Sequence, residues 1–166
     1  FSDNANNKKL ADRLRLMAPL YKEEVHIFAK KSIQKLKDLD GKRVAVGSEG
    51  GGSWLTAVTL FDYANIKPEI EYTSKGDAAQ AVLQGDLDAM IFVAGKPVSF
   101  FSGLGKLKEH YPQQFDNVHF LEIDPDSFTR KLPYVKSTIG PDDYPWLEET
   151  ITTAAVKALL VAFDFS

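Results

Sequence analysis

The hydrophobic and polar positions of this chain follow two periods in turn, one typical of strands and one typical of helices. Four short apolar runs predict strands, at 43–46, 69–72, 89–93 and 118–123. Helical spacing or a cap-plus-proline start predicts a helix after each run, at 54–64, at 78–84, from Pro97, and from 124 to about 132. This alternation predicts an α/β fold with a mainly parallel sheet and helices on both faces.

Capping residues are expected to set the ends of two of these helices. Asn65 follows the last apolar residue of the first helix and is expected to close it. Asp77 is a good N-cap for the second helix, and Gly85 suits the left-handed position just after it. The strands and helices are therefore expected to be joined by short, defined loops.

The N-terminal stretch gives a weaker pattern. Residues 3–9 are polar and are expected to be a frayed lead-in, while 10–20 has the spacing of a weak helix stopped by Pro19. The chain begins at Phe1 without an initiator methionine, so we interpret it as a processed or excised segment. Residues 1–24 are expected to form a lead-in segment.

The remainder is expected to be one α/β ligand-binding lobe spanning 25–163. A strand is predicted at 25–29, and 151–163 is interpreted as its partner strand rather than as a helix. Prolines and a glycine make the stretch from 133 to 145 loop-rich. Two segments close to opposite ends of the chain are therefore predicted to pair.

A glycine-rich loop separates the first strand of the regular pattern from its first helix. Four of its residues are glycines: Gly47, Gly50, Gly51 and Gly52. A strand, a glycine loop and a helix start in this order aim backbone N–H groups and the positive end of a helix dipole at one point. Right-handed crossovers bring three such loops to one edge of the sheet, at 47–53, 73–77 and 94–97. We therefore expect a pocket there that attracts an anion.

The spacing of these glycines does not match two common nucleotide sites. Reading G-x-G from Gly50 puts Leu55 where the dinucleotide fingerprint needs its third glycine. A P-loop needs lysine where Ser53 stands, and the second strand ends without the acid that would hold a ribose. A tight turn without a ligand is the alternative interpretation of the loop.

Composition narrows the possible classes of function. The 166 residues are 44% hydrophobic, which is enough for one core. A net charge of −3 without a basic stripe argues against nucleic acid, and no apolar run approaches the roughly 20 residues of a membrane helix. The absence of cysteine excludes disulfides and thiolate metal sites.

The sequence shows no recognisable catalytic or metal-binding arrangement. His26, His110 and His119 are not spaced as metal ligands, and neither Ser48 nor Ser53 has a histidine at a readable partner position. We therefore predict no catalytic residues, no metal and no cofactor. Five aromatic residues could line a pocket as well as a core: Phe100, Phe101, Tyr134, Tyr144 and Trp146.

Several stretches, in order along the chain, resemble one family of receptors. They lie at 20–27, 36–47, 85–89, 94–97 and 132–134, at Ile139 and Tyr144, and at 153–161. In combination they resemble the TAXI family of periplasmic solute receptors for TRAP transporters. The resemblance implies the second lobe of a two-lobed receptor of the type II periplasmic binding protein class, with the first lobe absent and a periplasmic or other extracytoplasmic location.

The resemblance also implies a ligand, partners and contacts. The ligand is expected to be a small anion such as a carboxylate or an amino acid, and the partner a membrane permease of a TRAP-type transporter, with no nucleic acid and no membrane insertion. Together with the loop argument, it gives the expected contacts Ser48, Glu49, Gly50, Gly51, Gly52, Ser53, Trp54, Ser74, Gly95, Pro97, Val98 and Tyr144. Many members read more like G-S-G-T at the glycine loop, so the bulky Trp54 leaves the ligand's identity open.

The sequence is therefore compatible with three different classes of function. The first is a solute-binding lobe without enzymatic activity. The second is a nucleotide-using α/β enzyme built on the same loop. The third is a sensor or scaffold module that has lost its ligand, which would be favoured if Trp54 filled the site.

Overall fold

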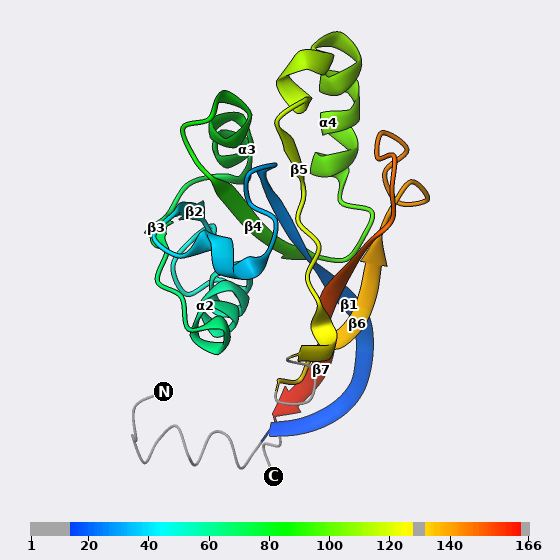
Figure 1. The fold of residues 1–166 in the computed structure, drawn as a ribbon. Helices are drawn as coiled ribbons and strands as arrows, with labels where there is room; N and C mark the ends of the chain where they lie inside the picture. The colour runs from blue at the N-terminus through cyan, green and yellow to red at the C-terminus, as the bar shows by residue number, and fades with distance from the viewer. Residues whose placement is uncertain (1–13, 128–131, 164–166) are drawn as a thin grey trace.

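A mixed sheet forms the centre of the molecule (Figure 1). This computed structural model describes residues 14–127 and 132–163, and within them seven strands share the sheet. The strands are β1 (Leu14–Lys30), β2 (Arg43–Ala45), β3 (Glu69–Glu71), β4 (Ala89–Ala94), β5 (Val118–Phe120), β6 (Val135–Ile139) and β7 (Ile151–Phe163). The main path through the sheet runs β3-β2-β4-β1-β7-β6, and β5 pairs with β1 beside it.

Helices cover both faces of this sheet, as the sequence predicts. The helices are α2 (Gly52–Ala64), α3 (Lys75–Gln84) and α4 (Ser99–His110), with short 3₁₀ turns η1 (Leu36–Leu39), η2 (Pro112–Phe115) and η3 (Pro125–Ser127). Helix α2 packs on one face in a cluster with Val25, Ile27 and Ile91. Helices α3 and α4 pack on the other face in a cluster with Phe28 and Met90 (Figure 1). Successive residues of each strand point to opposite faces, so the same strands supply both cores.

The parallel part of the sheet is smaller than the sequence predicts. Strand β2 runs parallel to β3 and to β4, whereas the pairings of β1 with β4, β5 and β7 and of β6 with β7 are all antiparallel. The predicted strand at 118–123 is present only over its first half, as β5, and it does not extend the parallel set. Strand β1 takes the edge of β4 that a further parallel strand would need, because the register pairs residues 24–29 with residues 89–94.

The prediction of a weak helix at 10–20 is wrong for residues 14–20, which belong to β1; residues 10–13 lie outside the described part of the chain. Of the expected lead-in at 1–24, residues 14–24 likewise form strand, and residues 1–13 are not described. Pro19 is tolerated because the ladder between β1 and β7 shifts register on both sides of it. Residues 14–20 form a strand despite their helical spacing because they pair with β7, near the other end of the chain. The local sequence pattern carries no signal of that pairing.

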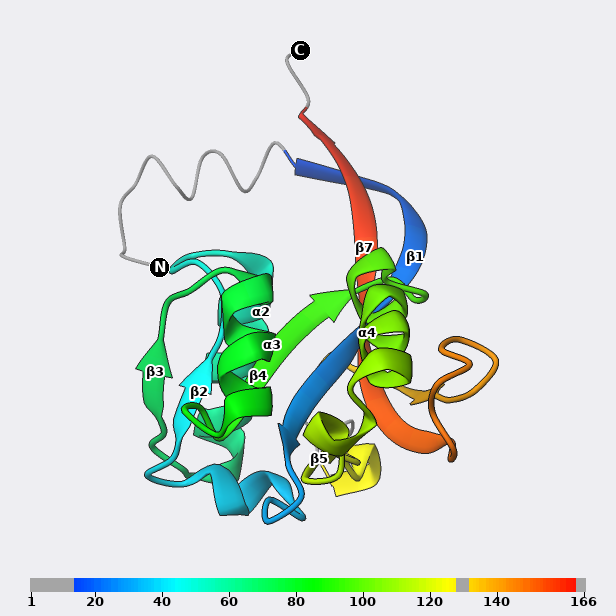
Figure 2. The same ribbon diagram turned by 90° about the horizontal axis from the view of Figure 1, so that it is seen from above.

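Strand β7 confirms the interpretation of 151–163, and it pairs with β1 as predicted. Figures 1 and 2 show β1 and β7 side by side as two long strands. The stretch predicted to be loop-rich contains a strand that the sequence reading missed, β6, which pairs antiparallel with β7. The expected helix from 124 to about 132 is represented by the turn η3, and residues 128–131 of that prediction lie outside the described residues.

Three helix starts differ from the prediction, while two helix ends agree with it. Helix α2 begins at Gly52, two residues before its predicted start. Asn65 and Gly85 close α2 and α3 in left-handed conformations, as expected. The N-cap of α3 is Ser74 rather than Asp77, because the Ser74 hydroxyl accepts a hydrogen bond from the Asp77 N–H and donates one to the Asp77 carboxylate. Helix α4 begins at Ser99, two residues after Pro97.

Candidate ligand-binding site

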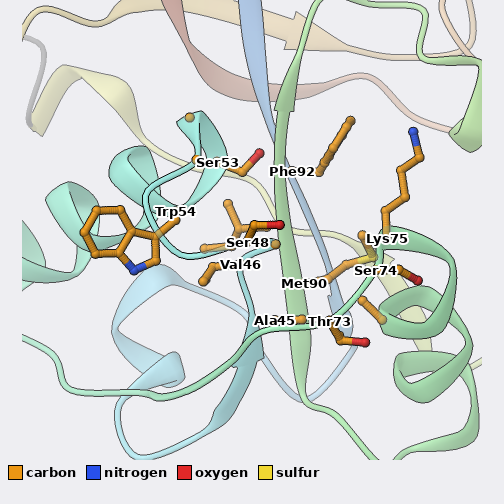
Figure 3. A pocket seen from close by; sticks show the side chains of 15 residues that line it. Ala45, Val46, Ser48, Ser53, Trp54, Thr73, Ser74, Lys75, Met90 and Phe92 are labelled. Carbon is orange, nitrogen blue, oxygen red and sulfur yellow. The ribbon is translucent and has the colours of Figure 1, made fainter.

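A cleft of about 260 Å³ lies beyond the carboxyl ends of β2 and β3, against β4. Figure 3 shows the starts of α2 and α3 on its two sides, with side chains of β4 between them. It is lined by Ala45, Val46, Gly47, Ser48, Gly51, Gly52, Ser53, Trp54, Thr73, Ser74, Lys75, Ala78, Met90, Ile91 and Phe92. Two of the three loops predicted to converge, 47–53 and 73–77, therefore do meet at one cleft.

The glycines of the first loop serve different purposes. Gly47 and Gly50 have φ angles of +77° and +78°, a backbone conformation that favours glycine. Gly51 closes a turn by donating its N–H to the Ser48 carbonyl at 3.0 Å, and a Cβ at Gly51 would stand 3.1 Å from that same oxygen. A Cβ at Gly52 would meet no atom within 4 Å, so this position faces open space. The loop is thus both a tight turn and an open approach to a helix start.

Helix α2 begins without a side-chain cap. Its N-cap is Gly51, which has no side chain to accept a hydrogen bond, so the N–H groups of Gly52, Ser53 and Trp54 have no acceptor within the helix. All three residues line the cleft. The Ser53 hydroxyl has a partner already, because it accepts the N–H of Val93 at 3.0 Å. The first turn of α2 therefore offers backbone donors, together with the positive end of the helix dipole.

The second side of the cleft is formed by the start of α3. The Ser74 hydroxyl, an expected ligand contact, is engaged in capping through its bonds with Asp77. Lys75 extends beside the cleft, with its ammonium nitrogen 5.3 Å from the centre of the Phe92 ring and 5.9 Å from that of Phe100. Among the described residues that line the cleft, Lys75 is the charged one, and none is an aspartate or a glutamate. Both the backbone and the side chains of the cleft therefore favour an anion.

Trp54 lies on the wall of the cleft (Figure 3). It is partly buried and packs against the core cluster under α2. Its indole therefore shapes one side of the space and leaves the cleft open. Trp54 therefore does not fill the site, which would have favoured a module that has lost its ligand.

The third predicted loop is arranged differently. Gly95, Pro97 and Val98 do not line the cleft. The N–H of Lys96 donates to the Glu24 carboxylate at 3.3 Å, and the N–H of Val98 donates to the Tyr144 hydroxyl at 2.9 Å. These loop donors are therefore occupied by side chains of the protein itself. Their position does not support the expected ligand contacts at this loop.

Tyr144 is also part of the core and does not line the cleft. Its side chain is fully buried, and burial raises its pKa to about 12. Its hydroxyl lies 2.8 Å from Nε2 of His26, whose Nδ1 lies 3.0 Å from the Glu24 carbonyl oxygen. Because a carbonyl oxygen can only accept, Nδ1 carries the proton and Nε2 accepts from the tyrosine. Burial lowers the pKa of His26 to about 4, so both groups are neutral parts of the core.

Six of the twelve predicted contacts therefore line the cleft: Ser48, Gly51, Gly52, Ser53, Trp54 and Ser74. The other six do not: Glu49, Gly50, Gly95, Pro97, Val98 and Tyr144. The sequence reading missed Lys75 and the β4 residues Met90, Ile91 and Phe92. Lys75 could have been found, because it lies within the loop 73–77 that was expected to reach this edge.

The carboxylate of Asp88, just before β4, has a structural role. Asp88 accepts hydrogen bonds from the Lys30 ammonium at 2.9 Å and from the Arg43 N–H at 3.0 Å. Burial alone would raise the pKa of Asp88, but the hydrogen bonds from Lys30 and Arg43 outweigh it and lower the pKa. In the described ranges, 14–127 and 132–163, no cluster of three or more His, Asp or Glu side chains could hold a metal ion.

Across the same described ranges, no helix combines the length and apolar character needed to cross a membrane.

Solved structures with similar folds include three binding proteins or binding cores. The arginine-, lysine-, histidine-binding protein ArtJ from Geobacillus stearothermophilus is 14% identical, with a TM-score of 0.47 over 98% of this chain and 54% of that one. The aliphatic sulphonate binding protein SsuA from Escherichia coli is 17% identical, with a TM-score of 0.47 over 87% and 40%. The GluR0 ligand-binding core from Nostoc punctiforme, in complex with L-glutamate, is 17% identical, with a TM-score of 0.45 over 90% and 53%.

This chain spans about half the length of the solved chains that it matches. A family model, by contrast, matches nearly all of it, from residue 2 to residue 165. The protein whose α/β lobe and cleft are described above belongs to the NMT1-like family.

Proposed function

We propose that this chain is a solute-binding lobe that holds a small anionic molecule, such as a carboxylate or an amino acid, without transforming it. The observation that carries the proposal is the composition of the cleft. Backbone donors at an uncapped helix start and one lysine face a space, and none of the described residues that line it is acidic. An acidic lining would repel the same ligand that this one attracts.

The shape of the cleft indicates how such a ligand would bind. A carboxylate accepts several hydrogen bonds, and the N–H groups of Gly52, Ser53 and Trp54 are the donors best placed for it. Met90, Ile91 and Phe92 contribute a largely apolar floor between the two helix starts. A small organic acid therefore fits better than an inorganic ion, because its carbon skeleton would cover that floor.

The proposal extends to the setting in which the lobe works. A second lobe would close over the cleft and trap the ligand, and a TRAP-type permease would receive it in the periplasm or another extracytoplasmic compartment. This part rests on the resemblance of the chain to TAXI receptors. It is supported by the position of the cleft at the edge of the sheet, where a second body can reach it.

A thermal-shift comparison tests the proposal. A ligand present at about 100 times its Kd stabilises the folded state by roughly 2.7 kcal/mol, which raises the Tm of a domain of this size by about 5–10 °C. We expect small carboxylates to raise the Tm of the wild-type chain. Gly52→Val should abolish the rise, because it places a branched side chain in the open space beside the first-turn N–H groups of α2.

The matched control is Gly103→Val. Gly103 is exposed in α4, and a Cβ there also meets no atom within 4 Å, but the position is away from the cleft. This variant should keep the full ligand response. Stabilisation by nucleotides alone would contradict the proposal in favour of a nucleotide-using enzyme. Indifference to every compound would contradict it in favour of a scaffold module.

A further inference from the structure

Lys75 has an unusual set of neighbours for a surface lysine. Its ammonium lies over two aromatic rings, Phe92 of β4 and Phe100 of α4, at 5.3 and 5.9 Å from their centres. The ion pairs of the described residues do not include Lys75. Asp77, the acid of the same helical turn, is engaged by Ser74. The charge of Lys75 is therefore held in place without being neutralised.

This arrangement differs from that of Lys96, the lysine of the loop 94–97. The Lys96 ammonium donates to the Asp143 carboxylate at 3.0 Å and to the Thr138 carbonyl. A carboxylate partner cancels most of a lysine's charge at short range. Aromatic faces attract a cation through the ring quadrupole and leave its net charge intact. Of these two lysines, Lys75 is thus the one whose charge a ligand can use.

We propose that Lys75 is a specificity-determining residue of the cleft, selecting ligands that carry an ionised carboxylate over otherwise identical ligands that carry a neutral amide. This inference rests on the proposed function, because it concerns the same cleft. The ammonium reaches the ligand's second polar group, on the α3 side of the cleft. The backbone donors of α2 hold the first group on the opposite side.

Phe100 acts in this proposal as a positioning residue. It does not line the cleft, yet its ring lies within cation–π range of Lys75. The ring is itself held against Phe101, with centroids 5.3 Å apart in an edge-to-face arrangement. Phe101 is fully buried. A chain of aromatic contacts therefore runs from the core under α4 to the cation beside the cleft, and it limits where the flexible lysine side chain can go.

The test compares the acid and the amide of one skeleton. L-glutamate and L-glutamine, and succinate and succinamate, are titrated into the 166-residue chain, and each Kd is taken from protein-detected NMR shifts. The wild type should bind each acid about tenfold more tightly than its amide, since a hydrogen bond to a charged group is roughly twice as strong as a neutral one. Lys75→Met should bring that ratio close to one by weakening the acid and sparing the amide.

Three further variants separate specificity from structure. Lys75→Arg should keep most of the preference, because it retains the charge. Phe100→Leu should reduce the preference without changing the affinity for the amide, as expected of a positioning residue. Lys67→Met should leave the ratio unchanged, because it removes an exposed lysine just before β3, at the opposite end of that strand from the cleft.

The outcomes distinguish this inference from the proposed function. A wild type that binds acids, with a Lys75→Met variant that keeps the same acid-to-amide ratio, overturns the role of Lys75 and leaves the solute-binding lobe standing. A wild type that binds none of the four probes counts against both. An equal loss of acid and amide binding in Lys75→Met would also overturn the inference, because it indicates a structural role.

Discussion

Phe101→Ala should lower the free energy of unfolding by about 3–5 kcal/mol, the usual range for removing a buried aromatic ring. The ring is fully buried at the centre of the core between the sheet and α4. It stacks on His26 with centroids 4.9 Å apart and meets Phe120 edge-on at 5.1 Å. Alanine would leave a cavity bounded by aromatic rings, which cannot collapse into the space.

Denaturant unfolding monitored by circular dichroism measures this loss as a lower midpoint at unchanged slope. Tyr111→Ala is the matched control, an aromatic residue at the C-terminal cap of the same helix that is 56% exposed. The control should change stability by less than about 1 kcal/mol. Equal effects of the two substitutions would show that the aromatic cluster is not the core of this half of the molecule.

Acidification from pH 7 to pH 4 should remove roughly 3 kcal/mol of stability through His26 alone. Its folded pKa of about 4 lies below its ordinary value of 6.5 because the ring is buried. Between pH 6.5 and pH 4, His26 is mostly protonated in the unfolded chain and mostly neutral in the folded chain. The stability supplied by the neutral ring is therefore complete above pH 6.5 and is lost as pH falls towards 4.

The surroundings of His26 explain why it resists protonation. The Tyr144 hydroxyl donates to Nε2, and the hydroxyl oxygen already accepts the Val98 N–H, so an Nε2 proton would leave the tyrosine proton without its acceptor. Asp143 opposes the shift by its negative charge, and Lys96 adds to it, but both effects are smaller than that of burial.

The measurement is the free energy of unfolding against pH, for the wild type and for His26→Gln. Between pH 6.5 and 4.5 the free energy of unfolding should fall more steeply for the wild type than for the variant. The difference between the two slopes should approach about 1.4 kcal/mol per pH unit. His110→Gln removes an exposed histidine outside this cluster and serves as the control. Parallel pH curves for the wild type and His26→Gln would show that His26 titrates normally in the folded state.

Local signals predicted the α/β part of the fold because they act within one strand–loop–helix unit. Asn65 closes helix α2 as expected, because the closing residue is the direct neighbour of the helix in sequence. Strand β1 was only partly predicted, since the pairing of residues 14–24 depends on β7, more than 120 residues away. Strand β6 was missed for a different reason, because Pro133 and Pro141 flank it and make the stretch resemble a loop, although its partner β7 follows soon after it in sequence.

In the candidate site, too, the features set by neighbouring residues were predictable and those set by distant residues were not. The glycine loop and the start of α2 are contiguous in sequence, so their contribution to a cleft was predictable. The loop at Gly95 was expected to contribute in the same way, but a carboxylate from β1, 72 residues earlier, accepts the Lys96 N–H. The position of Lys75 at this edge was predictable from the loop 73–77, but its contacts with rings of β4 and α4 were not, because cation–π contacts leave no mark in local spacing.

The central claim is that the starts of α2 and α3 hold an anion, and the amide resonances of the 166-residue chain test it directly. Titration with L-glutamate and with succinate should move the ¹⁵N–¹H signals of Gly52, Ser53 and Trp54, together with that of Lys75, in a saturable way. The amide signals of Lys96 and Val98, whose N–H groups donate hydrogen bonds to Glu24 and Tyr144, should not shift. Saturable shifts confined to the 94–98 loop, or no saturable shifts at all, would contradict the claim.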